Sequence, residues 1–250
     1  MRVALVTGTT AGIGAAVARG LHADGLRVIA AARRADRLGA LAEGLGERLL
    51  PWTLDVTDAA ATAALPDALP EGWRDVDVLV NNAGLALGQA PAQEAALEDW
   101  ERTVETNVLG TMRLTHAILP GMVARGRGRI VTIGSVAARY PYPGGNAYAA
   151  SKAFVEAFTA NLKADLIGTG VHSTTIAPGL VGDTEFSRVR FGGDEARAAS
   201  IYDGLAAMAP DDVADAVRWV ASRPAHVNVN YLELMPNCQA PGPLMFNRST

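Results

Sequence analysis

Short runs of apolar residues alternate along the chain with longer segments whose apolar positions recur at helical spacing. The short runs predict strands at residues 3–7, 28–32, 49–54, 76–80, 129–133, 171–176 and 227–234. The longer segments predict helices at 13–23 and 34–45, around 98–123, and at 148–167 and 211–221. Strands that alternate with helices favour a parallel sheet covered on both faces. We therefore predict an α/β fold, a single Rossmann-type doubly wound parallel sheet of about seven strands with helices on both faces.

No repeat, low-complexity tract or long linker interrupts this alternation, so one domain is expected over residues 1–250. Pro51 removes a backbone donor from the third predicted strand and favours an edge position for it. In doubly wound sheets, ligands bind beyond the carboxyl ends of the strands, so the loops there are expected to carry the chemistry. We predict a lid over the substrate at about residues 182–208, because the segment from Gly182 to Asp194 is polar and flexible enough to close over it.

Composition narrows the class of protein. Of the 250 residues, 49% are hydrophobic, which is enough to bury a full core. The net charge is −4 with acids and bases interspersed, so the chain lacks the concentrated positive field that nucleic acids and anionic membranes need. No apolar run approaches the roughly 18 residues of a membrane span. Cys238 is the single cysteine, which excludes an intrachain disulfide and favours a reducing, cytoplasmic location.

A glycine-rich turn follows the first predicted strand and leads directly into a helix. It contains Gly8, Thr9, Thr10, Gly12, Ile13 and Gly14. Glycines let the backbone approach a pyrophosphate, and a helix N-terminus offers free N–H groups and partial positive charge. The position of the turn favours a dinucleotide site over the alternative, a chance turn.

The end of the second predicted strand indicates which dinucleotide binds. An NAD site needs a carboxylate there for the ribose hydroxyls, whereas this strand ends in Arg33 and Arg34. Guanidinium groups bind a 2′-phosphate through paired, charge-assisted hydrogen bonds, so we predict an NADP site. The alternative is that both arginines begin a solvated helix face. Asp36 is interpreted as a residue of the first helical turn.

Three further loops are candidates for cofactor contacts. Asp55 and Val56, after the third strand, are placed beside the adenine. Small residues next to an amide let the backbone pass close to a cofactor, although such a sequence is also simply a good turn. The loop after the sixth strand is expected at the nicotinamide end. These last two loops contribute Asn82, Ala83 and Gly84, and Pro178, Gly179, Val181 and Thr184.

Tyr148 and Lys152 are four residues apart in a predicted helix, so their side chains share one face. A free tyrosine has a pKa of about 10, and a nearby ammonium is expected to lower it by favouring the phenolate. Lys152 and Lys163 are the only lysines among 22 basic residues, which makes a lysine at this spacing notable. The alternative is a tyrosine beside a surface lysine.

Two polar residues complete the candidate site. Ser135 lies just beyond the fifth strand, where its hydroxyl can hold the substrate oxygen that Tyr148 protonates or deprotonates, or act only as a cap. Asn107 lies within a helical segment, where it either supports a water relay behind Lys152 or interrupts the helix. The four histidines show no ligand spacing, and no metal site is predicted.

In order and spacing, these residues resemble the short-chain dehydrogenase/reductase family almost from end to end. The resemblance rests on the Gly8–Gly14 turn, residues 81–84, Asn107, Ser135, Tyr148 and Lys152. It implies that Asn107, Ser135, Tyr148 and Lys152 form a catalytic tetrad. It also implies a homo-oligomer, often a tetramer packed through long helices.

A narrower resemblance links the chain to the NADP-dependent 3-hydroxy acid dehydrogenases. It rests on residues 81–88, 141–146, 178–181, 184–187, 189–191 and 224–230. It implies reversible hydride transfer between NADP and a small 3-hydroxy acid such as serine, allo-threonine or 3-hydroxypropionate. Two residues depart from the pattern: Ala177 replaces an expected acid, and Asp183 replaces an expected glycine and adds negative charge near the site.

A carboxylate substrate needs a cationic partner, for which Arg188, Arg190 and Arg139 are candidates, each with a surface arginine as the alternative. Two other functions stay open from the sequence. One is an NADPH-dependent reductase of a larger ketone in secondary metabolism. The other is a non-catalytic NADP-binding sensor, which the intact Tyr148 and Lys152 disfavour.

Overall fold

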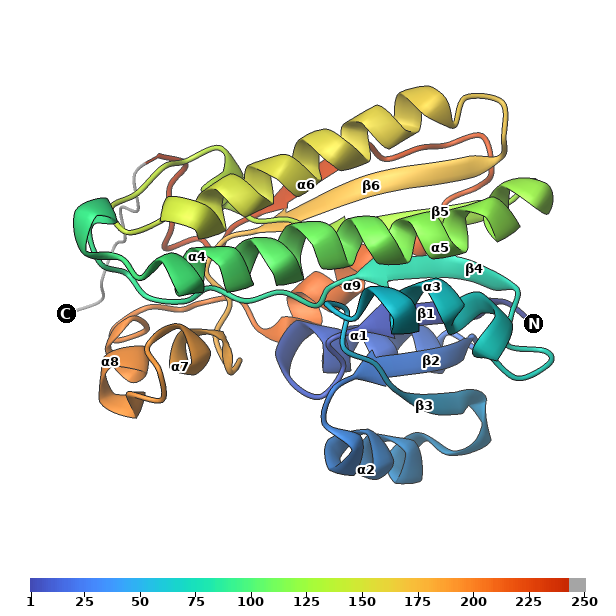
Figure 1. Ribbon diagram of the computed structural model, residues 1–250, viewed down its shortest axis with the longest axis horizontal. Coiled ribbons are helices and arrows are strands. Elements are labelled where there is room, and N and C mark those ends of the chain that lie inside the picture. The colour runs from blue at the N-terminus through green and yellow to red at the C-terminus, as the bar shows by residue number, and fades with distance from the viewer. Residues whose placement is uncertain (243–250) are drawn as a thin grey trace.

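The computed structural model describes residues 1–242 and contains one sheet of seven parallel strands, in the order β3-β2-β1-β4-β5-β6-β7 (Figure 1). Residues 243–250 of the predicted domain lie outside the described residues. The predicted doubly wound parallel sheet is confirmed, and Pro51 lies in the edge strand as expected. The strands are β1 (Val3–Thr7), β2 (Arg27–Ala32), β3 (Leu49–Thr53), β4 (Val76–Asn81), β5 (Gly128–Ile133), β6 (Val171–Pro178) and β7 (Tyr231–Leu234).

Helices cover both faces of the sheet (Figure 1). One face carries α1 (Gly12–Ala23), α2 (Ala35–Leu45) and α9 (Pro210–Ala221). The other carries α3 (Ala59–Ala68), α5 (Thr111–Ala124) and α6 (Asn146–Asp165). Two short helices, α7 (Phe186–Arg190) and α8 (Glu195–Ser200), lie within the predicted lid segment, away from both layers (Figure 1).

The core follows from the period of two along each strand. In β1, Ala4 and Val6 pack toward α1 and α9, whereas Val3 and Leu5 pack toward α3 and α5. Both sets are fully buried, which explains why the strand is apolar at consecutive positions instead of alternating with polar residues.

The helical segment predicted around residues 98–123 is continuous. It begins with α4 (Leu97–Val104), passes through a π-helical segment (Glu105–Gly110) and continues as α5. Asn107 lies in this π-helical segment, so it does not end the helix. Gly110 lies against Val56, where a Cβ atom would come within 2.8 Å of Cγ2 of that valine.

The structure corrects two predicted boundaries. The predicted strand 227–234 is paired only over β7, because the side chain of Asn228 replaces backbone partners at its start. Its Oδ1 accepts from the Ser173 nitrogen at 3.2 Å and its Nδ2 donates to the Ser173 oxygen at 3.1 Å. The helix predicted at 148–167 begins at Asn146 and ends at Asp165.

Three helices were not predicted as elements: α3, which contains Pro66, and the short α7 and α8. Within residues 1–242, no helix combines the length and apolar character needed to cross a membrane.

Candidate functional site

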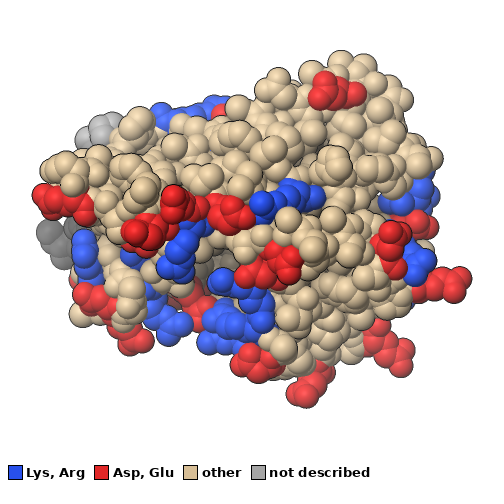
Figure 2. Space-filling model, viewed as in Figure 1, with Lys and Arg blue, Asp and Glu red and all other residues tan. Residues whose placement is uncertain are grey.

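The predicted site residues gather around one cavity at the carboxyl edge of the sheet. The cavity has a volume of about 490 Å³ and is lined by all the predicted catalytic and cofactor residues except Thr9 and Asn107. Of the three arginines considered for a substrate carboxylate, only Arg190 lines it. In the view of Figure 2, basic side chains gather beside a hollow in the surface, with acidic side chains close by. Residues distant in the sequence therefore meet at the place that the strand order predicts.

The glycine-rich turn packs α1 tightly against the end of β1. Gly8 and Gly12 have φ angles of 71° and 51°, a region that disfavours side chains. At Gly14, a Cβ atom would overlap the Gly8 carbonyl and the side chain of Asn82. Only a residue without a side chain allows this close approach, which leaves the first turn of α1 facing the cavity. The turn thus fits the phosphates of a dinucleotide.

The side chains of two predicted cofactor residues form hydrogen bonds that stabilise this turn. The Asn82 amide donates to the Thr7 oxygen at 2.7 Å and so joins the end of β4 to the end of β1. Thr9 is 1% exposed, and its hydroxyl donates to the Ala31 oxygen at 3.4 Å. The side chains of Asn82 and Thr9 therefore support the loop.

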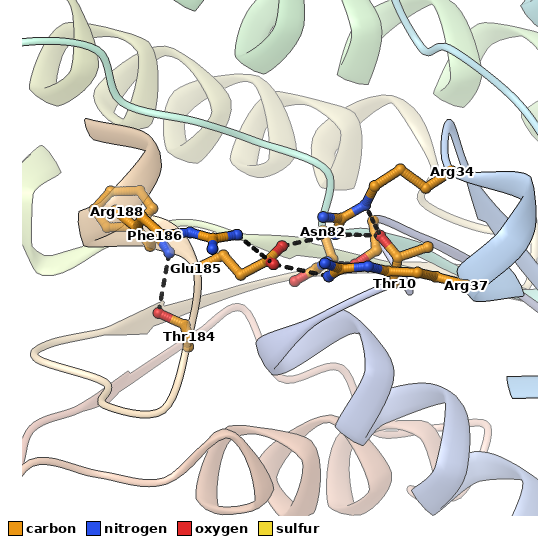
Figure 3. Close-up of polar contacts among 9 residues, drawn as sticks. Thr10, Arg34, Arg37, Asn82, Thr184, Glu185, Phe186 and Arg188 are labelled. Carbon is orange, nitrogen blue, oxygen red and sulfur yellow. Dashed lines mark hydrogen bonds and ion pairs between the residues drawn. The ribbon is translucent and has the colours of Figure 1, made fainter. Parts of the chain in front are cut away.

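Arg33 and Arg34 have different surroundings. The Arg33 side chain is 68% exposed, and its nearest carboxylate among the described residues, Asp55, is 4.0 Å away. Arg34 instead donates to the Thr10 hydroxyl from Nε at 3.1 Å and from Nη2 at 2.7 Å. Its Nη2 also donates to Glu185 at 2.7 Å (Figure 3).

Glu185 is a residue of the site that the sequence did not reveal as functional. It lies between the guanidinium groups of Arg34, Arg37 and Arg188 (Figure 3). The hydrogen bond from Arg34 is the largest cause that lowers the Glu185 pKa, to about 2, against an opposing effect of burial. The carboxylate is therefore charged at any physiological pH. The only signal in the sequence was its place in the segment 184–187.

Tyr148 and Lys152 face the same cavity from α6. The Lys152 ammonium lies 5.9 Å from the centre of the Tyr148 ring and donates to the Ile133 oxygen at 2.8 Å. Burial lowers the Lys152 pKa to about 8. Burial also raises the Tyr148 pKa to about 12, opposed by a hydrogen bond with Ser135 and by the charge of Arg190.

This result corrects the expectation that Lys152 lowers the tyrosine pKa in the protein alone. The lysine hydrogen-bonds to a backbone carbonyl instead of the phenol, and desolvation is larger than any attraction between the two side chains. In the protein without a cofactor, Tyr148 is a protonated phenol at neutral pH.

Ser135 acts as a cap, which is one interpretation of its sequence position, while its contact with the substrate oxygen stays a prediction. Its Oγ accepts from the Ala137 nitrogen at 3.1 Å and so caps the short 3₁₀ turn Val136–Ala138. Against the larger effect of burial, the same side chain acts to lower the Tyr148 pKa. It is 8% exposed and lines the cavity beside the tyrosine.

Asn107 lies behind the cavity. Its Oδ1 accepts from the Leu85 nitrogen at 2.9 Å. Its Nδ2 donates to the Leu85 oxygen at 2.8 Å and to the Ser151 hydroxyl at 2.9 Å. These bonds tie the loop after β4 to α6, the helix that carries Lys152. Gly84 leaves space beside both side chains, since a Cβ there would come within 3.2 Å of Asn107 Oδ1 and 3.5 Å of Lys152 Nζ.

The three candidate arginines differ in what surrounds them. Arg139 pairs with Glu156 at 2.7 Å, and Arg188 pairs with Glu185 at 2.8 Å. Arg190 has no carboxylate within ion-pair distance in the part of the chain that the structure describes. It is half-buried in the wall of the cavity, and its Cζ lies 6.0 Å from the centre of the Tyr148 ring.

Several known dehydrogenases are similar to this chain in sequence and in fold. The chain is 52% identical over 247 residues to the NADP-dependent 3-hydroxy acid dehydrogenase YdfG of Salmonella typhi, which covers 99% of this chain and 100% of that protein. It is 48% identical over 232 residues to serine 3-dehydrogenase of Agrobacterium fabrum, with 93% and 92% covered. The closed form of a serine dehydrogenase complexed with NADP⁺ superposes with a TM-score of 0.95 at 49% identity, covering 99% of this chain and 100% of that one.

The family model of short chain dehydrogenases matches residues 2–192. This match runs from β1 through α7 and includes the glycine-rich turn and the tyrosine–lysine pair on α6. Because the same residues build the cavity described above, the sequence match and the geometry lead to one conclusion: the chain belongs to the short chain dehydrogenase family.

Proposed function

We propose that this protein catalyses the NADP-dependent oxidation of a small 3-hydroxy acid to the corresponding 3-oxo acid, and the reverse reduction. The relatives named for NADP-dependent 3-hydroxy acid and serine dehydrogenation support this substrate class. Serine, allo-threonine and 3-hydroxypropionate are the expected types of substrate.

The proposed cofactor position follows the cavity from β3 to the lid. Arg33 and Arg34 lie at the end expected for the 2′-phosphate, and Asp55 and Val56 beside the adenine. The first turn of α1 faces the pyrophosphate. The backbone contacts nearer the nicotinamide are assigned to Ala83, Gly84, Pro178, Gly179, Val181 and Thr184, and Tyr148 and Lys152 complete that end.

When bound, the nicotinamide accepts or donates the hydride. In oxidation, Ser135 holds the substrate hydroxyl and Tyr148 as phenolate takes its proton, while the C–H bond at the same carbon breaks with its electron pair. In reduction, the Tyr148 phenol returns that proton to the carbonyl oxygen. Lys152, held through Asn107 and the loop after β4, supplies a positive charge near the phenol; the water relay behind Lys152 is part of this proposal.

The observation that carries the substrate class is the position of Arg190. Its Nε donates to the Gly88 oxygen and its Nη2 to the Gly144 oxygen, each at 3.1 Å, so the guanidinium is held from two sides. It lies next to Tyr148 without a carboxylate partner among the described residues. A half-buried cation without a counter-ion favours an anionic ligand. The carboxylate of a 3-hydroxy acid, which is separated from the reacting carbon by one carbon atom, is such an anionic group.

A substrate panel with two variants tests this proposal. NADPH absorbance is followed with L-serine, L-allo-threonine, 3-hydroxypropionate, neutral alcohols of similar size, and bulky ketones. Arg190→Met is expected to raise the KM for the acids about 10- to 100-fold, the scale of a lost charge-assisted hydrogen bond, with little effect on neutral alcohols. Arg139→Met is the matched control and is expected to leave both unchanged.

Tyr148→Phe is expected to lower turnover of every substrate at least about 100-fold while NADPH binding is retained. If only the bulky ketones are turned over, the protein is a reductase of larger ketones and not a 3-hydroxy acid dehydrogenase. Tight NADPH binding without turnover of any substrate would indicate a sensor.

The proposal includes a cytoplasmic homo-oligomer, with a tetramer as the expected state. Exposed apolar side chains on the long helices support an assembly: Val104 on α4 and Phe154 on α6 are each 40% exposed. Light scattering of the purified protein measures its mass, and fractionation of the source cells measures its location. A monomer at micromolar concentration would contradict the assembly.

A further inference from the structure

We infer that the two neighbouring arginines after β2 have different functions: Arg33 binds the 2′-phosphate, whereas Arg34 anchors the lid to the cofactor half of the site through Glu185. The inference rests on the proposed NADP dependence and refines it, because the sequence alone predicts the same role for both arginines. Glu185 is then a positioning residue for the lid.

The geometry around Glu185 is that of an anchor. Its Oε2 accepts from Arg34, and its Oε1 accepts from Arg37 at 2.7 Å and from Arg188 at 2.8 Å (Figure 3). Arg34 and Arg37 belong to the segment around the start of α2, whereas Glu185 and Arg188 belong to the lid. The carboxylate therefore joins two segments that are 148 or more positions apart in the sequence.

Arg34 is partly occupied, and among residues 1–242 only its Nη1 donors lack a partner. A guanidinium has five N–H donors, and the Nε and Nη2 of Arg34 are directed at Thr10 and Glu185. Arg33 makes no hydrogen bond to any of residues 1–242, and its side chain is 68% exposed at the same edge of the cavity. A phosphate that enters this edge finds all the N–H donors of Arg33 without a hydrogen bond to residues 1–242, whereas Arg34 offers only those of Nη1.

The anchored segment reaches the reacting end of the cavity. Glu185 directly precedes α7, and Arg190 is the last residue of that helix. Phe186 packs on Tyr148 with ring centroids 5.3 Å apart, and the methyl group of Thr184 lies against Gly12. One short helix thus connects the arginines of the cofactor end to the cation proposed to bind the substrate carboxylate.

The charges of the cluster distinguish a purely electrostatic role of Glu185 from a role as anchor of the lid, because the two roles predict different effects of Glu185→Gln. Arg34, Arg37 and Arg188 carry three positive charges and Glu185 one negative charge. If Glu185 acted only through its charge, Glu185→Gln would make the edge more positive and strengthen 2′-phosphate binding. If it anchors the lid, the same change affects the substrate end and the order of the lid.

The test uses Arg33→Met, Arg34→Met, Glu185→Gln and the double variant Arg34→Met/Glu185→Gln. Dissociation constants for NADPH and NADH are measured by cofactor fluorescence, KM and kcat are measured for 3-hydroxypropionate, and limited proteolysis follows the lid. Arg33→Met is expected to reduce the preference for NADPH over NADH about 10- to 100-fold. Arg34→Met and Glu185→Gln are expected to change that preference less than about threefold, raise KM about tenfold and expose the lid to protease.

The double variant is expected to be no worse than either single variant, because both remove the same contact. Glu185→Asp should restore part of the KM, and Arg102→Met, a surface change on α4, should leave every readout unchanged. An equal loss of NADPH preference in Arg33→Met and Arg34→Met would overturn the inference, as would an unaltered lid and KM in Glu185→Gln. NADPH binding and proteolysis need no turnover, so failure of the proposed 3-hydroxy acid activity is distinguishable from failure of this inference.

Discussion

At the scale of single residues, burial shifts the pKa values of both Tyr148 and Lys152 toward the neutral side chain. The tyrosine pKa is about 12 and the lysine pKa about 8, so at neutral pH the phenol is protonated and the lysine is still mostly charged. A protonated phenol is ready for reduction, where it donates a proton. Oxidation needs the phenolate, which bound oxidised nicotinamide favours by its positive charge.

The two directions are therefore expected to differ in pH dependence. With saturating NADP⁺, kcat/KM for oxidation should rise between pH 6 and pH 9, since the phenolate fraction increases up to about tenfold per pH unit below the tyrosine pKa. Reduction should stay level or fall over the same range. Initial rates in both directions across this range measure the effect; oxidation that slows as the pH rises would contradict it.

Lys152 carries a cost in stability. Its folded-state pKa of about 8 lies below the value of 10.5 for the unfolded chain. Burial of the charged Lys152 therefore lowers the free energy of unfolding below pH 8. This cost disappears as the pH rises toward 10.5. At pH 7, Lys152→Met is expected to raise the free energy of unfolding by up to about 2–3 kcal/mol while turnover falls at least about 100-fold.

Urea unfolding of Lys152→Met and the unsubstituted protein at pH 7 and pH 10 checks this prediction. The stability difference should shrink at the higher pH. A variant that is less stable at pH 7 would show that the hydrogen bond to the Ile133 oxygen outweighs the burial of the charge.

At the scale of elements, the contact between α1 and the end of β1 is decisive for the cofactor site. Gly14 is in ordinary helical conformation, but a side chain there would overlap the Gly8 carbonyl. The constraint comes from the neighbouring turn and not from the helix itself. The order of elements and the spacing of the glycines predicted the turn between β1 and α1, but not the contact of Gly14 with Gly8.

Gly14→Ala is expected to lower the free energy of unfolding by about 1–3 kcal/mol and to weaken NADPH binding, since α1 must move away from the turn. Gly39→Ala on α2 is the matched control. No atom lies within 4 Å of a Cβ there, so alanine should stabilise α2 by about 0.5–1 kcal/mol. Urea unfolding and NADPH titration of both variants measure these effects. Equal behaviour of the two variants would contradict the proposed close packing.

At the scale of the whole molecule, the cavity is built by loops from nearly the whole described chain, from Gly8 to Gly242. A ligand that fills it should therefore stabilise the complete fold and not one segment. At a concentration of NADPH one hundred times its Kd, the free energy of unfolding is expected to rise by about 2.7 kcal/mol.

Urea unfolding with equal concentrations of NADPH and NADH measures this effect. NADPH should stabilise more, because Arg33 has a phosphate to bind. Equal stabilisation by both cofactors would contradict the NADP assignment.

The sequence by itself determined the doubly wound parallel sheet and the edge position of β3. It also determined that the loops after the strands carry the residues of the cavity. These follow from patterns that act locally: apolar period, glycine placement and the spacing of Tyr148 and Lys152. It also singled out Ser135, which lines the cavity together with Tyr148.

Only the tertiary structure decided what surrounds each side chain in the cavity. It gave Arg33 and Arg34 different partners, brought Arg190 beside Tyr148 and Glu185 beside Arg34, and raised the Tyr148 pKa above that of a free phenol through burial. The physical reason is that hydrogen-bond partners and desolvation come from residues far away in the chain. Arg34 and Glu185 are 151 positions apart, and no local pattern specifies their contact.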